Sequence, residues 1–131
     1  MENLELNEVG VVQSPYLHDA TLISMELDEG DVSFLLRAPT GKIIRLLLRG
    51  VRGLSGNNIY ESNVMFEVRV TPVVDANQEE FCRVLHFPSG TKIPDAQIAR
   101  FRGDHLIFVQ IYPTLGADVL ALCQEIKWSY K

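Results

Sequence analysis

Hydrophobic and polar residues alternate along much of this chain, which predicts β-strands with one buried and one exposed face. In residues 20–28, Ile23, Met25 and Leu27 fall on one face, and the residues that alternate with them are polar. The same alternation recurs in two further segments, 32–37 and 42–50. Short runs of turn-forming residues separate the three segments, so together they predict an antiparallel meander.

Three later segments also have the character of strands: residues 63–71, 105–112 and 124–130. The alternation of Trp128 and Tyr130 with charged residues favours a closing strand at the C-terminus. Residues 51–58 are rich in glycine, so they are expected to form a connection. A turn is expected at Gly116.

One helix is predicted at about residues 77–87. Asn77, followed three residues later by Glu80, has the order of a capping box. Phe81, Val84 and Leu85 then form one apolar stripe at helical spacing.

Residues 95–102 fit two structures. They fit a short helix after Pro94, or a strand over 97–102 that pairs through a turn at Gly103-Asp104, and the strand is favoured. The fold class is therefore mainly β, an α+β chain with one helix. Six or seven antiparallel strands are expected, in a meander-rich sandwich or a partly open barrel.

The length of 131 residues fits a single domain over residues 1–131. Residues 1–15 are expected to be a loose acidic arm or an edge strand. No apolar run approaches the roughly 20 residues that cross a bilayer, and the acidic N-terminus lacks the pattern of a secretory signal. A cytoplasmic protein that does not bind membranes is expected.

Charge is segregated along the chain, although the net charge is only −5. Residues 1–31 carry eight acids and no Lys or Arg, whereas residues 32–60 carry five bases and no acid. The favoured interpretation is that neighbouring strands neutralise one another. The alternative is a basic patch, with Arg45, Arg49 and Arg52, that meets an acidic protein partner.

Two His-Asp pairs are the strongest candidates for chemistry. His18-Asp19 and Asp104-His105 each stand where a strand is predicted to begin. Adjacent strand residues point to opposite faces, so neither pair forms a dyad by itself. A metal or acid–base site would require the two strand ends to meet. Hydrogen bonds from these side chains to nearby backbone groups are the favoured alternative.

The remaining chemistry of the sequence is sparse. No dinucleotide or phosphate-loop motif is present, so no cofactor is expected. Cys123 lies among apolar residues and is expected to be an inert buried thiol, and Cys82 has no base beside it in the sequence. The pI near 5.1 argues against nucleic acid as a partner. An enzymatic activity is therefore not favoured.

Three short segments carry a resemblance to known families: Leu17–Leu22, Gly50–Leu54 and Gly116–Cys123. They are similar to small bacterial all-β families of unknown function, some of which are grouped with immunity proteins that neutralise polymorphic toxins. The resemblance implies an all-β domain in a bacterial cytoplasm and brings no catalytic residue with it.

These observations favour a non-enzymatic protein-interaction module, immunity-like, with a protein partner and with self-association through the N-terminal arm as a further expectation. Arg outnumbers Lys eight to four, which suits carboxylate pairing at protein interfaces. The alternative is a domain that binds a small ligand or a metal through His18, Asp19, Asp104 and His105.

Overall fold

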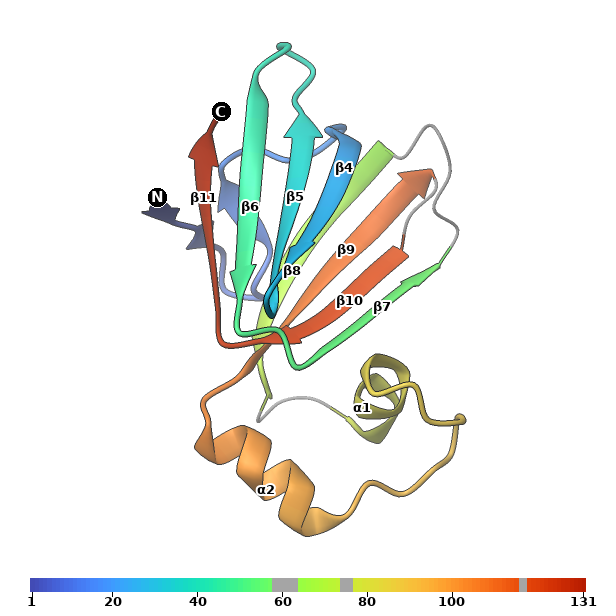
Figure 1. Ribbon diagram of the computed structural model, residues 1–131. Coiled ribbons are helices and arrows are strands. Elements are labelled where there is room, and N and C mark those ends of the chain that lie inside the picture. Colours follow the sequence, from blue (N-terminus) through green and yellow to red (C-terminus); the bar gives the residue numbers. More distant parts are fainter. Residues whose placement is uncertain (58–63, 74–76, 116–117) are drawn as a thin grey trace.

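Nine strands form one strongly curled sheet, with two helices against one side of it, in the computed structural model of the chain (Figure 1). The structure describes residues 1–57, 64–73, 77–115 and 118–131. The strands are β1 (Glu2–Asn3), β2 (Glu5–Leu6), β3 (Val12–Ser14), β4 (Thr21–Asp28), β5 (Asp31–Arg37), β6 (Ile43–Arg49), β7 (Gly53–Asn57), β8 (Val64–Pro72), β9 (Ile107–Leu115), β10 (Asp118–Cys123) and β11 (Glu125–Tyr130), and the helices are α1 (Gln78–Val84) and α2 (Asp95–Gly103).

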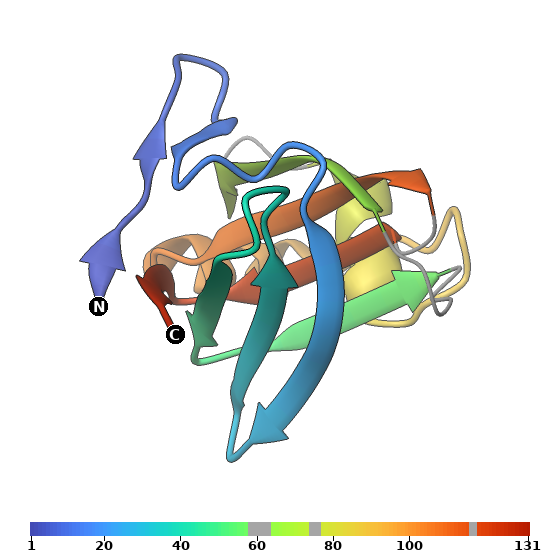
Figure 2. The same ribbon diagram turned by 90° about the horizontal axis from the view of Figure 1, so that it is seen from above.

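The sheet has the strand order β1-β11-β6-β5-β4-β8-β9-β10-β7, and every pairing is antiparallel. The predicted meander is present as β4-β5-β6. Figure 2 shows that these three strands run steeply across the direction of β7, β9 and β10. The sheet thus folds over on itself without closing into a barrel, and the predicted mainly β, α+β class is confirmed.

The first hydrophobic core fills the space inside this fold. Alternate residues of β5 and β6 point into it and are at most 2% exposed: Val32, Phe34, Leu36, Ile44, Leu46 and Leu48. Val109 and Ile111 of β9 face them from the other half of the sheet. This period of two is what the sequence pattern predicted.

A second core lies between β9, β10 and the two helices. Phe81 of α1 contacts the rings of Phe101 in α2 and Phe108 in β9, with centroids 5.9 and 5.3 Å apart. Leu120 and Leu122 of β10 belong to this core, whereas the residues that alternate with them belong to the first. The strand β10 therefore has apolar residues at almost every position, because both of its faces are covered.

The glycine-rich segment after β6 is a strand, contrary to the expected connection. Gly53–Asn57 pairs with β10 along five residues as β7. A Cβ atom at Gly53 would lie 2.7 Å from the carbonyl oxygen of Val84. Glycine is thus required here because the end of α1 packs directly on the backbone of β7.

Residues 95–103 form helix α2, so the favoured hairpin strand over 97–102 is wrong. Asp95 lies in the first turn, Arg100 and Arg102 lie in the last, and both signs suit the helix dipole. Ile98 and Phe101, three residues apart, are the buried positions. The chain therefore has a second helix. Gly103 and Asp104 lie at its C-terminal end and do not form a hairpin turn.

Helix α1 begins and is capped as predicted, but it ends earlier than residue 87. The side chain of Asn77 accepts a hydrogen bond of 3.0 Å from the backbone N–H of Glu80. The helix ends at Val84, and His86 adopts a positive φ of 62°. The backbone N–H groups of Leu85 and His86 close the final turn.

Residues 1–15 form strands at the periphery of the sheet rather than a loose arm. The two residues of β1 pair with β11 at one edge, and Trp128 donates from Nε1 to the carbonyl oxygen of Asn3 at 3.2 Å. Strands β2 and β3 form a small separate sheet.

The turn expected at Gly116 lies outside the described residues. In the described part of the chain, neither helix has the length and apolar character to cross a membrane.

Candidate functional site

The β4–β5 hairpin projects from the body of the molecule (Figure 2). Its turn consists of Glu29 and Gly30, with φ values of 46° and 89°, which is the two-residue type I′ geometry that suits strand twist. The backbone N–H of Gly50 donates to a carboxylate oxygen of Asp31 at 3.1 Å, and that of Val51 donates to the carbonyl oxygen of Gly30 at 2.7 Å. These bonds fix the tip of the hairpin against the β6–β7 corner.

Apolar residues on the distal part of β4 are exposed, although the sequence predicted them on the buried face. Ile23, Met25 and Leu27 are 44%, 38% and 69% exposed, respectively. The register shifts between Leu22 and Ser24, so Ile23 occupies a β-bulge. Beyond this bulge, Met25 and Leu27 lie opposite Phe34 and Val32 of the first core, but no described strand covers β4 on its other side past Thr21.

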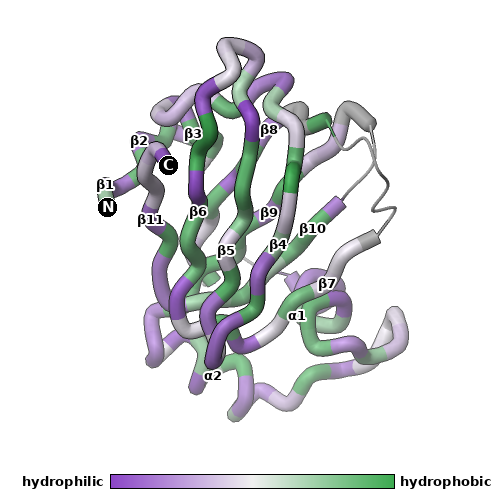
Figure 3. Tube along the Cα trace, turned by 45° about the horizontal axis from the view of Figure 1, so that its top comes forward, coloured by the Kyte–Doolittle hydropathy of each residue, from purple (hydrophilic) through white to green (hydrophobic). Residues whose placement is uncertain are grey.

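The same hairpin carries unneutralised negative charge. Glu26 and Asp28 are exposed on β4, and Glu29 is exposed in the turn. None of the three forms an ion pair with another residue of the described ranges. Figure 3 shows the alternation of hydrophobic and hydrophilic residues along β4, down to its hydrophilic tip. The hairpin thus joins an apolar surface to an acidic one.

The expected neutralisation between the first two charge segments does not occur among the described residues. Arg49 lies 3.7 Å from Glu125, its direct neighbour across β6 and β11. Arg52 lies 3.4 Å from Asp104 at the end of α2. Both acidic partners come from the third part of the chain, and among the described residues no acid of residues 1–31 forms an ion pair with Lys or Arg.

The three arginines expected to bind a partner are therefore partly engaged within the fold. Arg49 and Arg52 form the two ion pairs above. Arg45 lies in β6 between Leu35 and Ser129 on the neighbouring strands, and its Nε atom is buried. Two of the three thus already have an acidic partner within the chain.

The two His-Asp pairs lie at opposite ends of the sheet. His18 and Asp19 precede β4, and Thr21 of β4 pairs with Val64 at the start of β8. Asp104 and His105 precede β9, whose first residue pairs with Pro72 at the end of β8. Eight residues of extended strand, about 26 Å, separate these two positions. No group of three metal-ligating side chains occurs among the residues described.

His18 and Asp19 do interact with each other, contrary to the expectation for a strand. Nε2 of His18 lies 3.5 Å from a carboxylate oxygen of Asp19. Asp19 has a φ of 63°, so the pair lies in a turn before β4 and not in a strand. The rule that adjacent side chains diverge therefore does not apply here.

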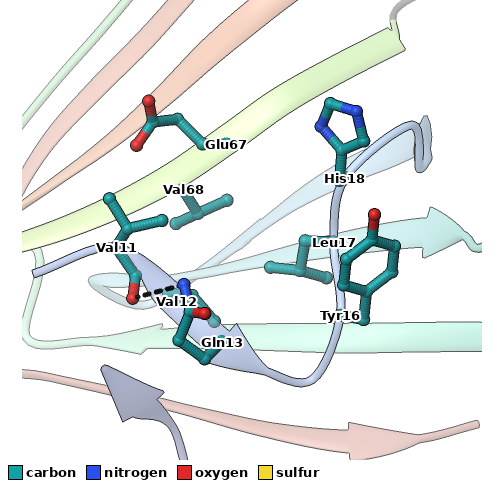
Figure 4. A pocket seen from close by; sticks show the side chains of 8 residues that line it. All are labelled: Val11, Val12, Gln13, Tyr16, Leu17, His18, Glu67 and Val68. Atoms are coloured by element: carbon teal, nitrogen blue, oxygen red, sulfur yellow. Dashed lines mark hydrogen bonds between the residues drawn. The ribbon is translucent and has the colours of Figure 1, made fainter. Parts of the chain in front are cut away.

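His18 lines a cavity of about 290 Å³ between β8 and the segment that precedes β4 (Figure 4). Tyr16 stands beside it, with ring centroids 6.2 Å apart in an edge-on arrangement. Glu67 lines the opposite side and lies 3.5 Å from the guanidinium of Arg69. The cavity thus combines apolar walls with one imidazole and one paired carboxylate, and its volume lies just below the range of about 300–1,000 Å³ that is usual for ligand pockets.

Both cysteines are buried, as expected for Cys123. Sγ of Cys82 donates to the carbonyl oxygen of Thr91 at 3.0 Å. Burial, with a smaller contribution from the charge of Glu125, raises the pKa of Cys123 to about 12. His86 donates from Nε2 to the carbonyl oxygen of Leu54 at 2.7 Å. The two thiols and the His86 imidazole are therefore held by packing and hydrogen bonds within the fold.

Comparison with known proteins finds no match: no family model, curated protein or solved structure is significantly similar to this chain. Function is therefore inferred from the chain's own residues. Sequence patterns missed the exposed apolar residues of β4, because neither the bulge at Ile23 nor the lack of a described neighbouring strand beside residues 22–28 has a signature in the local sequence. The run of acids in residues 26–31 was the only available signal.

Proposed function

We propose that this chain is a non-enzymatic protein-interaction module that binds a basic partner protein through the β4–β5 hairpin. The observation that carries the proposal is the exposure of Ile23, Met25 and Leu27 beside unpaired acidic side chains. Exposed apolar residues grouped together are typical of interaction sites. Adjacent negative charge would attract and orient a basic partner.

An immunity-like role is the specific form of this proposal. A bacterial cytoplasmic protein that covers the basic surface of a toxin, such as a nuclease, would need an acidic surface with an apolar centre. The projecting hairpin supplies both features. A toxin gene adjacent to the gene for this chain in the source organism would support this role.

The alternative of a metal or small-ligand domain has weaker support. Its four candidate residues are divided between two distant places in the fold, and of these His18 lines the cavity described above. The proposed arginine surface is also weaker than the hairpin, because Arg49 and Arg52 already have acidic partners.

Affinity capture from the source organism tests the proposed function. The bait would be the wild-type chain, a Met25→Ser/Leu27→Ser variant, and a Val9→Ser control that removes an exposed apolar side chain from the turn between β2 and β3. The altered side chains are exposed, so each change should alter the free energy of unfolding by only about 0.5 kcal/mol.

A specific basic protein should be retained by the wild type and by the control, and lost by the hairpin variant. Retention by the hairpin variant at the wild-type level would contradict the proposed surface. Failure of the wild type to retain any specific protein would contradict the function itself.

A further inference from the structure

We propose that β4 binds an extended, basic segment of its partner as an additional strand along its free edge. This inference rests on the proposed function and specifies how the partner is held. It concerns the backbone of β4 as well as its side chains, so it can fail while the proposed function stands.

Within the described ranges, residues 22–28 of β4 have a free edge. On one side, β4 pairs with β5 along its length, but on the other it pairs with β8 only at Thr21. No other strand in the described ranges pairs with residues 22–28 on that side. Edge strands are commonly protected by Lys or Pro, by a β-bulge or by a covering element. β4 contains neither Lys nor Pro, and its bulge lies at Ile23, before Met25 and Leu27.

The turn determines which backbone groups face this edge. A two-residue type I′ hairpin begins with a hydrogen-bonded pair, here Asp28 and Asp31. Hydrogen-bonded and non-bonded pairs then alternate, so Glu26 bonds to β5 while Met25 and Leu27 do not. The N–H and C=O groups of Met25 and Leu27 therefore point toward the free edge.

Side-chain chemistry defines the segment that would fit there. Met25 and Leu27 lie opposite Phe34 and Val32, on the core-facing side of the sheet, whereas Glu26 lies on the other side. An added strand would thus place alternate apolar residues beside Met25 and Leu27 and basic residues beside the acids. This is recognition by strand addition, with backbone bonds for affinity and side chains for specificity.

A second copy of the chain is a less suitable occupant. Two β4 strands paired edge to edge would bring together two hairpins, each with Glu26, Asp28 and Glu29 and with no base on β4 or its turn. Pairs of strands are about 4.8 Å apart, well within the distance of about 10 Å over which exposed charges repel at moderate salt. Charge complementarity therefore favours a basic partner.

Amide hydrogen exchange, measured by NMR on the full chain, tests this mode of binding. The probe is a nine-residue peptide of alternating lysine and valine, and the matched control peptide replaces each lysine with glutamate. At saturating lysine–valine peptide, the amides of Met25 and Leu27 should exchange slower by about tenfold or more. The amides of Glu26 and Asp28, already bonded to β5, should not change.

The other possible outcomes would overturn the inference, and each would point to a different cause. Binding of the lysine–valine peptide without slower exchange at Met25 and Leu27 would show docking through side chains alone, and the proposed function would stand. Protection that grows with protein concentration in the absence of peptide would identify a second copy as the occupant. If the lysine–valine peptide does not bind, or binds no better than its glutamate counterpart, strand addition by a basic segment is wrong. The capture experiment then decides the function separately.

Discussion

At the scale of single residues, the environment of Cys123 shows how the fold determines chemistry. Its side chain is fully buried in the first core, beside the charge of Glu125. Transfer of a thiolate into apolar surroundings is unfavourable, and the neighbouring carboxylate adds repulsion. Both effects raise the pKa of Cys123, to about 12. The thiol therefore stays protonated and inert at neutral pH.

This shift predicts a loss of stability in alkali. The unfolded chain should release the Cys123 proton near the ordinary pKa of 9.0, whereas the folded chain retains it up to about pH 12. Between these values the unfolded state binds fewer protons, so the free energy of unfolding falls as pH rises. The contribution approaches about 1.4 kcal/mol per pH unit.

Urea denaturation of the wild type and of Cys123→Ala at several pH values from 8 to 11 measures this contribution. The variant should be less stable at pH 8, because it leaves a small cavity. Above pH 9 its free energy of unfolding should fall less steeply than that of the wild type. Parallel pH profiles would show that Cys123 titrates normally in the folded chain.

At the scale of elements, the short strand β1 covers the edge of β11 and the side of Trp128. The Trp128 side chain donates to the carbonyl oxygen of Asn3, and its residue is only 7% exposed. Trp128 is also the single tryptophan of the chain. Its fluorescence therefore reports on this edge of the sheet.

Deletion of residues 1–3 should shift the fluorescence emission of Trp128 to longer wavelength, because the indole gains contact with water. Loss of the hydrogen bond and the strand pairing should lower the free energy of unfolding by about 1 kcal/mol. A chain that lacks only Met1, which precedes the paired residues, is the control. Unchanged emission after the longer deletion would show that β1 does not cover Trp128 in solution.

The strands and helices differ in how well they could be predicted from the sequence. Strands with one buried face, such as β5 and β6, were predictable because a period of two is dictated by burial. Helix α2 was ambiguous, since its two buried residues, Ile98 and Phe101, are too few to establish a period. Strand β7 was missed because its glycines serve close packing against α1, and the same residue type also suits turns.

The candidate site was less predictable than the fold. Ile23, Met25 and Leu27 have the pattern of a buried face. They are exposed because Ile23 lies in a bulge and because no described strand lies beside Met25 and Leu27 on the side away from β5. The distance between His18 and Asp104 depends on the pairing of β4 and β9 with opposite ends of β8. Such long-range registers are not encoded in local patterns.

At the scale of the whole molecule, two hydrophobic cores share one set of strands. Alternate residues of β10 enter the two cores: Ala121 and Cys123 enter the first, and Leu120 and Leu122 enter the second. A loss of structure in the helical layer would expose one face of β10 and release its pairing with β7. The two cores are therefore expected to unfold as one cooperative unit.

Two natural probes report on the cores separately and can test this expectation. Trp128 belongs to the first core and Cys82 to the second. In a Cys123→Ala background, urea unfolding followed by Trp128 fluorescence and by pulse labelling of Cys82 should give the same midpoint. Phe81→Ala, which removes the ring between α2 and β9, should lower both midpoints equally, with a loss of about 3–5 kcal/mol.

Phe87→Ala provides the matched control, because this ring is 44% exposed and belongs to neither core. Its effect on the free energy of unfolding should stay within about 0.5 kcal/mol. A Cys82 midpoint that falls in Phe81→Ala while the Trp128 midpoint stays constant would contradict the single unit. The helical layer would then unfold independently, and the curled sheet with its β4 edge would be stable without it.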